Sequence, residues 1–136
     1  MSESTENNNA AHAKTFVWHE VYGPSSSAST DFYTKALDWG VTEMPMGDSY
    51  TYKMFTVDAV PVAGCLGTTE HPELGDVPAH WSTYVGVDDV DARAEKCVSL
   101  GAKVLVPAMD VPTVGRMCLI QDPQGATFWL FKGTQS

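Results

Sequence analysis

The chain repeats one arrangement of strand-type and helix-type segments twice, and this duplication limits its fold more than any other feature. Residues 15–23 mix β-branched and aromatic residues as a strand does, and residues 28–40 carry apolar side chains at helical spacing. Three short strand-type segments follow within residues 41–67. After a proline-containing stretch at residues 68–80, the same order of one strand, one helix and three strands begins again. A repeat of roughly 60 residues is too long for a solenoid unit and indicates a duplicated β-α-β-β-β module.

The predicted ends of several elements depend on capping and turn residues. Gly40 is the expected C-cap of the first helix. Asp88 is the expected N-cap of the second helix, which Gly101 would close. Near the end of the chain, a proline between Asp122 and Gly125 predicts a tight turn, because proline presets one turn dihedral and glycine accepts a positive φ.

The chain divides into a tail and one domain. A length of 136 residues suits a single ordinary domain. Residues 1–14 are predicted to be a disordered, solvated tail, and residues 15–136 a single domain of the α+β class. Within that domain, module one covers 15–67 and module two covers 81–132. A connector rich in proline, glycine and acidic residues covers 68–80.

Composition makes several kinds of partner improbable. Eight Lys and Arg against 17 Asp and Glu give a formal charge of −9. Such a field repels phosphate backbones and anionic lipid, so we expect neither nucleic acid nor a membrane as a partner. It would favour a cationic ligand, although an acidic surface that keeps a protein soluble is the simpler explanation for most of the charge.

The location expected from the sequence is the cytoplasm. No apolar run approaches the roughly 20 residues that span a bilayer, and the N-terminal residues lack the basic and apolar regions of a signal peptide. The three cysteines form no C-x-x-C pair, and their odd number leaves at least one unpaired. These features favour a reducing compartment.

Four features together resemble the vicinal oxygen chelate superfamily, which includes glyoxalase I, extradiol dioxygenases and bleomycin-resistance proteins. They are the duplicated module order, the aromatic pair Phe32 and Tyr33 on the first helix, the segment VDDVDA over 87–92, and the DPQG turn before the last strand. The resemblance covers the chain from Phe16 to Lys132 and is greatest to a glyoxalase-like subgroup. It implies two modules that form a curved mixed sheet around a cavity, with the helices on the outer face.

The resemblance also implies positions for a metal ion. Catalytic members of the superfamily use four histidine or glutamate ligands, one on the first and one on the last strand of each module, and such ligands suit Fe, Mn, Ni or Zn. Counted from the family motifs, the corresponding positions here are Trp18, Ser82 and Trp129, with the fourth-strand position near Ala63. Because these side chains do not form a divalent site, we expect no metal and no cofactor. A one-residue error in strand register would bring His19 and His80 or Trp81 toward the cavity and reopen the metal interpretation.

The candidate ligand-binding residues are those expected on the cavity side of the strands. Alternation along the first strand places His19 and Val21 toward the helix and their neighbours toward the cavity. The predicted ligand-binding set is Trp18, Glu20, Tyr22, Tyr52, Met54, Ser82, Tyr84, Trp129 and Phe131. Aromatic walls with a few polar groups are typical of a small-molecule site. Trp129 and Phe131 could also be ordinary core residues.

Glu20 is the candidate charged group of this cavity. Among aromatic rings it could act as a catalytic base or could pair with a cationic ligand. A salt bridge to Lys53 or Arg116 would instead make it a structural residue.

The function that the sequence predicts is metal-free binding of an aromatic or cationic small molecule, as in bleomycin-resistance proteins. The alternatives are a metal-dependent lyase, isomerase or dioxygenase, and a metal-free enzyme that uses Glu20. The sequence contains no G-x-S-x-G nucleophile motif and no phosphate-binding glycine loop, so whether the chain is an enzyme stays open. Because superfamily members commonly dimerise, we also expect a homodimer.

Overall fold

The computed structural model describes residues 14–47 and 50–134, and within them the chain forms eight strands, two α-helices and one short 3-10 helix. The order of one strand, one helix and three strands occurs twice, which confirms the α+β class and the duplicated module. The chain groups into two compact units. We call Trp18–Ser82 the first unit, and the residues before and after it the second unit. The predicted tail, apart from Lys14, lies outside the described residues.

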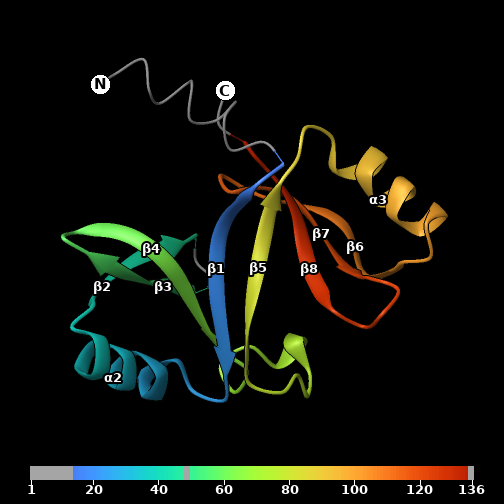
Figure 1. Cartoon of the computed structure of the whole chain (residues 1–136). Helices are drawn as coiled ribbons and strands as arrows, with labels where there is room; N and C mark the ends of the chain where they lie inside the picture. Colours follow the sequence, from blue (N-terminus) through green and yellow to red (C-terminus); the bar gives the residue numbers. More distant parts are fainter. Residues whose placement is uncertain (1–13, 48–49, 135–136) are drawn as a thin grey trace. The chain divides into compact units, whose positions relative to one another are not determined.

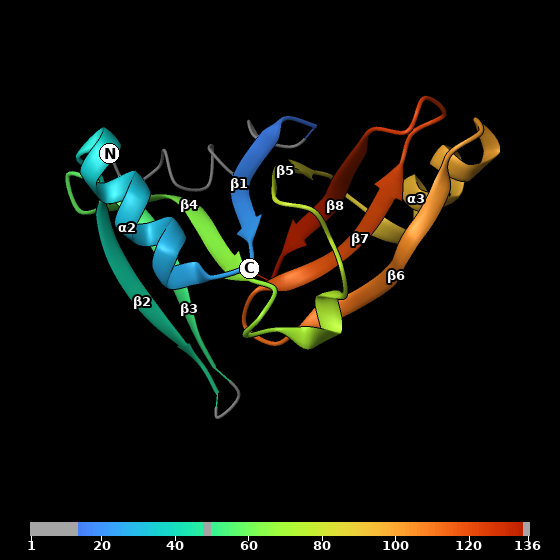
Figure 2. The same ribbon diagram turned by 90° about the horizontal axis from the view of Figure 1, so that it is seen from below.

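The first unit has four strands and one helix (Figure 1). Their bounds are β1 (Phe16–Gly23), α2 (Ser26–Leu37), β2 (Gly40–Met46), β3 (Tyr50–Val57) and β4 (Val60–Gly67). The strand order is β2-β3-β4-β1, in which β1 runs parallel to β4 and the other pairs are antiparallel. Seen from below, α2 follows one face of β2, β3 and β4 (Figure 2). This sheet therefore has a helix side and an opposite side.

The second unit repeats the arrangement. Its elements are β5 (His80–Gly86), α3 (Val90–Ser99), β6 (Lys103–Val111), β7 (Gly115–Gln121) and β8 (Thr127–Gly133). The strand order is β5-β8-β7-β6, with β5 parallel to β8. The first three residues of β5 belong to the first unit, and the first two of β1 to the second. No helix among the described residues is long and apolar enough to cross a membrane.

The end of α2 and the start of α3 differ from those predicted. The Ser25 hydroxyl accepts a hydrogen bond from the Ala28 amide at 3.1 Å and caps the start of α2. The helix stops at Asp38, which takes the left-handed conformation with φ of 59°. The predicted C-cap Gly40 is therefore wrong, and Gly40 instead begins β2. A short polar side chain such as that of aspartate tolerates this backbone conformation.

The start of α3 is displaced by one residue. Asp89, not the predicted Asp88, accepts a hydrogen bond from the Ala92 amide at 3.0 Å. The Asp88 carboxylate pairs with Arg93 instead, at 3.2 Å. Gly101 follows the helix with φ of 101°, as the sequence predicts for a closing glycine.

The turn before β8 forms as predicted. Asp122 Oδ1 accepts hydrogen bonds from the Gln124 amide at 2.8 Å and the Ala126 amide at 3.0 Å. Gly125 closes the turn with φ of 102°. This aspartate-centred turn fixes where β8 begins, and with it the alternation of the side chains that follow.

Each sheet packs its helix side into a separate core. In the first unit the buried residues are Val21, Phe55, Ala63 and Cys65, with Tyr33 and Trp39 packed against them. In the second unit they are Val90, Cys118, Ile120 and Leu130, with Phe128 among the side chains around them. Because side chains alternate along a strand, these cores determine which residues lie on the opposite face of each sheet.

Candidate functional site

The candidate site begins with the face of β1 that points away from α2. Val21 belongs to the core on the helix side, so Glu20 and Tyr22 point to the opposite side. Both are buried, Glu20 to 3% and Tyr22 to 5% exposure. His19 is exposed. The alternation that the sequence predicts for β1 is thus the one observed, while a role in ligand binding stays a prediction.

A chain of hydrogen bonds joins three side chains on this face. The Tyr52 hydroxyl donates to Glu20 Oε2 at 2.5 Å, and it accepts a hydrogen bond from Trp18 Nε1 at 3.1 Å. Indole nitrogen can only donate, so the Tyr52 oxygen accepts from Trp18 and the Tyr52 hydroxyl proton is directed to Glu20. The result is an acidic group held in place by an aromatic side chain on β3.

The Tyr52 hydroxyl stays protonated in this setting. Burial raises its pKa far above the ordinary value, and the nearby negative charge of Glu20 and the hydrogen bond to it raise the pKa further. Tyr52 is therefore protonated and a hydrogen-bond donor to Glu20 at neutral pH.

Gly64 on β4 leaves the space that this contact needs. It lies opposite Glu20 on one side and opposite Met54 on the other. A Cβ atom at this position would overlap the Tyr52 hydroxyl and would lie 3.2 Å from Glu20 Oε2. Any larger residue at Gly64 would therefore displace Tyr52 from Glu20.

The family motifs predict that the β4 site position falls near Ala63. Ala63 is buried in the core on the helix side, so Gly64 occupies the opposite face. The pairing of β3 with β4 shifts between Phe55 and Thr56, which marks a β-bulge. A bulge adds one residue to one strand of a pair. Beyond the bulge, each side chain therefore points to the opposite face from the one predicted by counting every second residue along the sequence.

Lys53 and Arg116, the two cations considered for a salt bridge with Glu20, have other partners. Lys53 donates to the Ser27 hydroxyl at 3.3 Å. Arg116 forms two hydrogen bonds to Asp91, at 2.9 and 3.0 Å, and an ion pair with Asp110 at 3.1 Å. These two ion pairs hold the pKa of Arg116 above its usual value.

The start of β5 supplies further groups to the first unit. Ser82 is buried to 4% exposure. The imidazole of His80 stacks on the ring of Tyr22, with centroids 5.1 Å apart and an angle of 4° between the ring planes. Between them, Trp81 points to the helix side, where its Nε1 donates to the Tyr33 hydroxyl at 3.1 Å. His80 and Ser82 consequently share the face of Glu20 and Tyr22.

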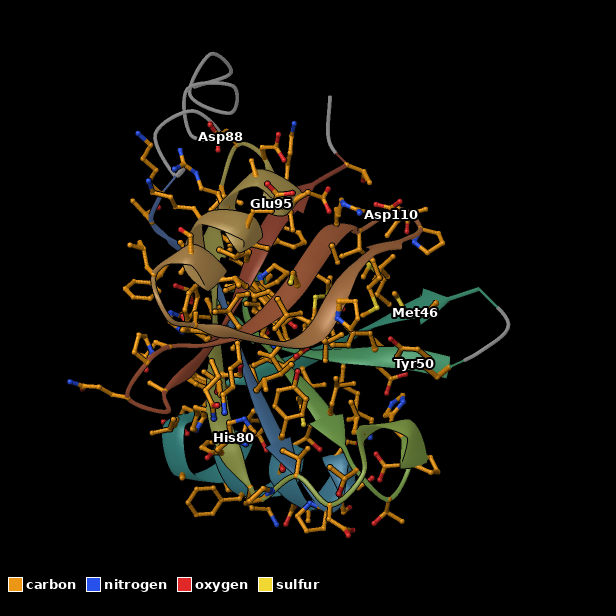
Figure 3. All side chains as sticks on the ribbon, turned by 90° about the vertical axis from the view of Figure 1, so that its right-hand side faces the viewer. Met46, Tyr50, His80, Asp88, Glu95 and Asp110 are labelled. Carbon is orange, nitrogen blue, oxygen red and sulfur yellow. The ribbon has the colours of Figure 1, made fainter. Side chains whose placement is uncertain are left out.

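The edge of this face is formed by the β2–β3 hairpin. Met46 and Tyr50 are paired across these strands and lie side by side next to the turn (Figure 3). The Tyr50 ring meets the His71 ring of the connector edge to face, with centroids 4.5 Å apart. Tyr52 and Met54 follow on the same side of β3, so all six predicted site residues of the first unit lie on one face of its sheet.

The remaining three predicted residues form an aromatic group in the second unit. Tyr84 stacks on Trp129 with centroids 5.5 Å apart and an angle of 7°, and it meets Phe131 edge to face at 5.9 Å. Leu130 and Phe128 point into the core beneath α3. Trp129 and Phe131 therefore lie on the face away from the helix, as the alternation along β8 predicts.

Comparison with known proteins bears on this arrangement. The profile of the Glyoxalase/Bleomycin resistance protein/Dioxygenase superfamily matches residues 12–130. The chain belongs to this superfamily. The resemblance to this superfamily predicted both the duplicated module and a sheet in each module with its helix on one face only.

Two curated relatives are similar in sequence. The chain is 31% identical over 118 residues to "Putative glyoxylase CFP32" of Mycobacterium tuberculosis, covering 87% of this chain and 44% of the relative. It is 31% identical over 126 residues to "Anthracycline biosynthesis protein DnrV" of Streptomyces peucetius, covering 85% and 46%. The chain thus spans less than half the length of these relatives.

Solved structures share the fold. Methylmalonyl-CoA epimerase from M. tuberculosis superposes with a TM-score of 0.63 at 13% identity, covering 88% of each chain. The hypothetical protein BH1468 from Bacillus halodurans superposes with a TM-score of 0.65 at 8% identity, covering 90% of this chain and 96% of that one. At these identities the likeness concerns the fold alone.

The residues at the metal positions of the superfamily do not fit a divalent cation. Trp18 has no lone pair available on its nitrogen, and its N–H is bonded to Tyr52. Trp129 is stacked on Tyr84. Among residues 14–47 and 50–134, no three His, Cys, Asp or Glu side chains are grouped as a metal site requires.

Sequence reasoning missed two participants in this face. Gly64 was overlooked because a glycine in a strand carries no signal of the ring that will lie over it. His80 was considered only as the result of a register error, because its contact with Tyr22 joins strands from different modules of the sequence. An unexplained glycine in the middle of a strand is the one sequence signal that could have indicated a close contact here.

Proposed function

We propose that the chain binds an aromatic or cationic small molecule on the face of the first unit that points away from α2, and that it does so without a metal ion. The observation that carries the proposal is the buried Glu20 carboxylate, held by the Tyr52 hydroxyl. A carboxylate in a low-dielectric setting attracts a nearby cation more strongly than one in water does. A cationic ligand group would pair with this charge.

The aromatic side chains around Glu20 support an aromatic or cationic ligand. Trp18 and Tyr22 lie on the same face, one on each side of Glu20 along β1. Flat rings offer stacking area, and the faces of tryptophan and tyrosine attract cations. The formal charge of −9 would also raise the rate at which a cation encounters the protein. A relative named for anthracycline biosynthesis agrees with an aromatic ligand.

A second candidate function is metal-free proton transfer by Glu20. The observation that favours it is the hydrogen bond from the Tyr52 hydroxyl, which holds the carboxylate of Glu20 in one orientation. In this case Glu20 would accept a proton from the bound molecule. The relative named a putative glyoxylase agrees with an enzyme.

The test is a titration with phenethylamine, an aromatic ring that carries an ammonium group, followed by Trp fluorescence and by calorimetry. Glu20→Gln keeps the shape of the side chain and removes the charge, and it should weaken binding roughly tenfold or more, as expected for a charge-assisted hydrogen bond. Glu43→Gln is the matched control, because Glu43 is an exposed glutamate on β2.

Two results would contradict the proposal. Wild-type protein that binds neither phenethylamine nor the neutral analogue ethylbenzene has no such site on this face. Equal affinity of wild type and Glu20→Gln for phenethylamine would show that Glu20 does not recognise the cation. Elemental analysis of protein purified without a metal-affinity step completes the test, since stoichiometric metal would contradict the metal-free part.

A further inference from the structure

His80 lies against Tyr22, on the face of the first unit that also carries Glu20. It is the first residue of β5, where Figure 3 labels it, and it is half-buried. Its ring lies parallel to that of Tyr22 at 5.1 Å. Tyr22 follows Glu20 by two positions on the same face, a separation of about 7 Å along an extended strand.

The hydrogen bond from His80 to the backbone fixes which ring nitrogen carries the proton. Nδ1 lies 2.7 Å from the Pro78 carbonyl oxygen. A carbonyl oxygen can only accept, so Nδ1 must be the donor. In the neutral imidazole Nε2 then has no proton and is a hydrogen-bond acceptor. Among the described residues, no hydrogen bond to Nε2 is formed.

The orientation of His80 is secured by its neighbour. Trp81 is bound on the helix side by its hydrogen bond to Tyr33. Its ring also meets those of Tyr33 and Trp39 edge to face, at 5.4 and 6.4 Å. A strand residue anchored on one side places the residues before and after it on the other. His80 therefore cannot turn to the helix side without breaking these contacts.

We propose that His80 is a specificity-determining residue of the first unit, whose Nε2 accepts a hydrogen bond from a hydroxyl group of the bound molecule. Glu20 and His80 then recognise two donors on one ligand, a cationic group and a hydroxyl group, while Tyr22 lies between them. The ligand class is a hydroxylated aromatic amine. This inference rests on the proposed function, because it assigns a second group to the same face.

The test compares tyramine with phenethylamine, which lacks only the ring hydroxyl group. Wild-type protein should bind tyramine roughly three- to tenfold more tightly, the ratio expected from one hydrogen bond to a neutral acceptor. His80→Phe keeps a flat ring over Tyr22 but removes the acceptor, so this preference should disappear while phenethylamine binding remains. His71→Phe, at the other histidine that packs against a tyrosine ring, is the matched control and should keep the preference.

A second measurement needs no ligand. Long-range ¹⁵N–¹H spectra of protein labelled at histidine, assigned with the His80→Phe variant, should show the neutral ring of His80 protonated at Nδ1 and unprotonated at Nε2. The opposite tautomer would overturn the inference, and so would a tyramine preference that survives in a folded His80→Phe variant. Equal binding of both amines by wild type would also overturn it while leaving the proposed function intact. Failure of wild type to bind either amine would refute both.

Discussion

Gly64→Ala should destabilise the protein although it adds only one methyl group. The added Cβ would overlap the Tyr52 hydroxyl, lie 2.5 Å from Tyr52 Cζ and lie 3.2 Å from Glu20 Oε2. Overpacking of this kind costs about 1–3 kcal/mol. Displacing Tyr52 also removes a hydrogen bond to a charged acceptor, worth about 1.5–3 kcal/mol. Alanine restricts the unfolded chain more than glycine does, which offsets up to about 1 kcal/mol.

We therefore expect the free energy of unfolding to fall by about 1.5–6 kcal/mol, to be measured by urea denaturation followed by circular dichroism. The mechanism can be tested with Tyr52→Leu, which removes the hydroxyl oxygen and Cζ that the new methyl group would approach most closely and leaves the contact with Glu20 Oε2. In this background Gly64→Ala should cost less than about 1 kcal/mol, so the two changes should be strongly coupled.

The control for this experiment is Gly23→Ala in β1. There the new Cβ meets only the Ser29 hydroxyl oxygen, at 3.3 Å, and a side-chain hydroxyl can move aside. Its effect should stay below about 1 kcal/mol. If Gly64→Ala cost the same with and without Tyr52, to within about 0.5 kcal/mol, the overlap with Tyr52 would not be the cause and the reasoning would be refuted.

Three further predictions concern single side chains. Burial raises the pKa of the Cys65 thiol to about 11, so little of it is thiolate at pH 8. Iodoacetamide should therefore label the half-buried Cys97 before Cys65 in the folded protein, as followed by mass spectrometry. Equal labelling rates of the two cysteines would contradict this. The hydrogen bond from Arg116 lowers the pKa of Asp91, so this contact contributes stability above the ordinary aspartate pKa of about 3.9 and loses it as the pH falls through the lowered value. Melting temperatures of Arg116→Gln should consequently fall less between pH 5 and about pH 2.5 than those of wild type, and parallel curves would argue against the linkage. Asp89→Ala removes the N-cap of α3 and should lower the free energy of unfolding by about 1 kcal/mol in urea denaturation, and an unchanged midpoint would show that another group caps the helix.

The faces of the strands were predictable because side-chain alternation is a local property. Val21 of β1 and Leu130 of β8 lie in the helix-side cores, and the residues directly before and after each of them point to the opposite face. Which β4 residue faces Glu20 could not be predicted to better than one position. A bulge is produced by pairing with the neighbouring strand, so its effect on alternation near Ala63 and Gly64 is absent from the pattern of β4 itself.

The helix caps also depend partly on local sequence and partly on contacts with other side chains. Serine and aspartate caps are encoded close to the helix they cap, yet two adjacent acids at 88 and 89 are equivalent in the pattern. Which of them caps α3 depends on Arg93, because this side chain draws the Asp88 carboxylate away from the helix end.

The sequence by itself determined the class of fold, the duplicated order of elements and the side of the sheet on which Trp18, Glu20 and Tyr22 lie. These follow from propensity, turn chemistry and period, all of which act over a few residues. Only the tertiary structure decided that Tyr52, 32 residues from Glu20 in the chain, donates to its carboxylate, and that His80 lies on Tyr22. Contacts of this kind depend on which strands pair and in which register, and that choice is made by the packing of the whole sheet.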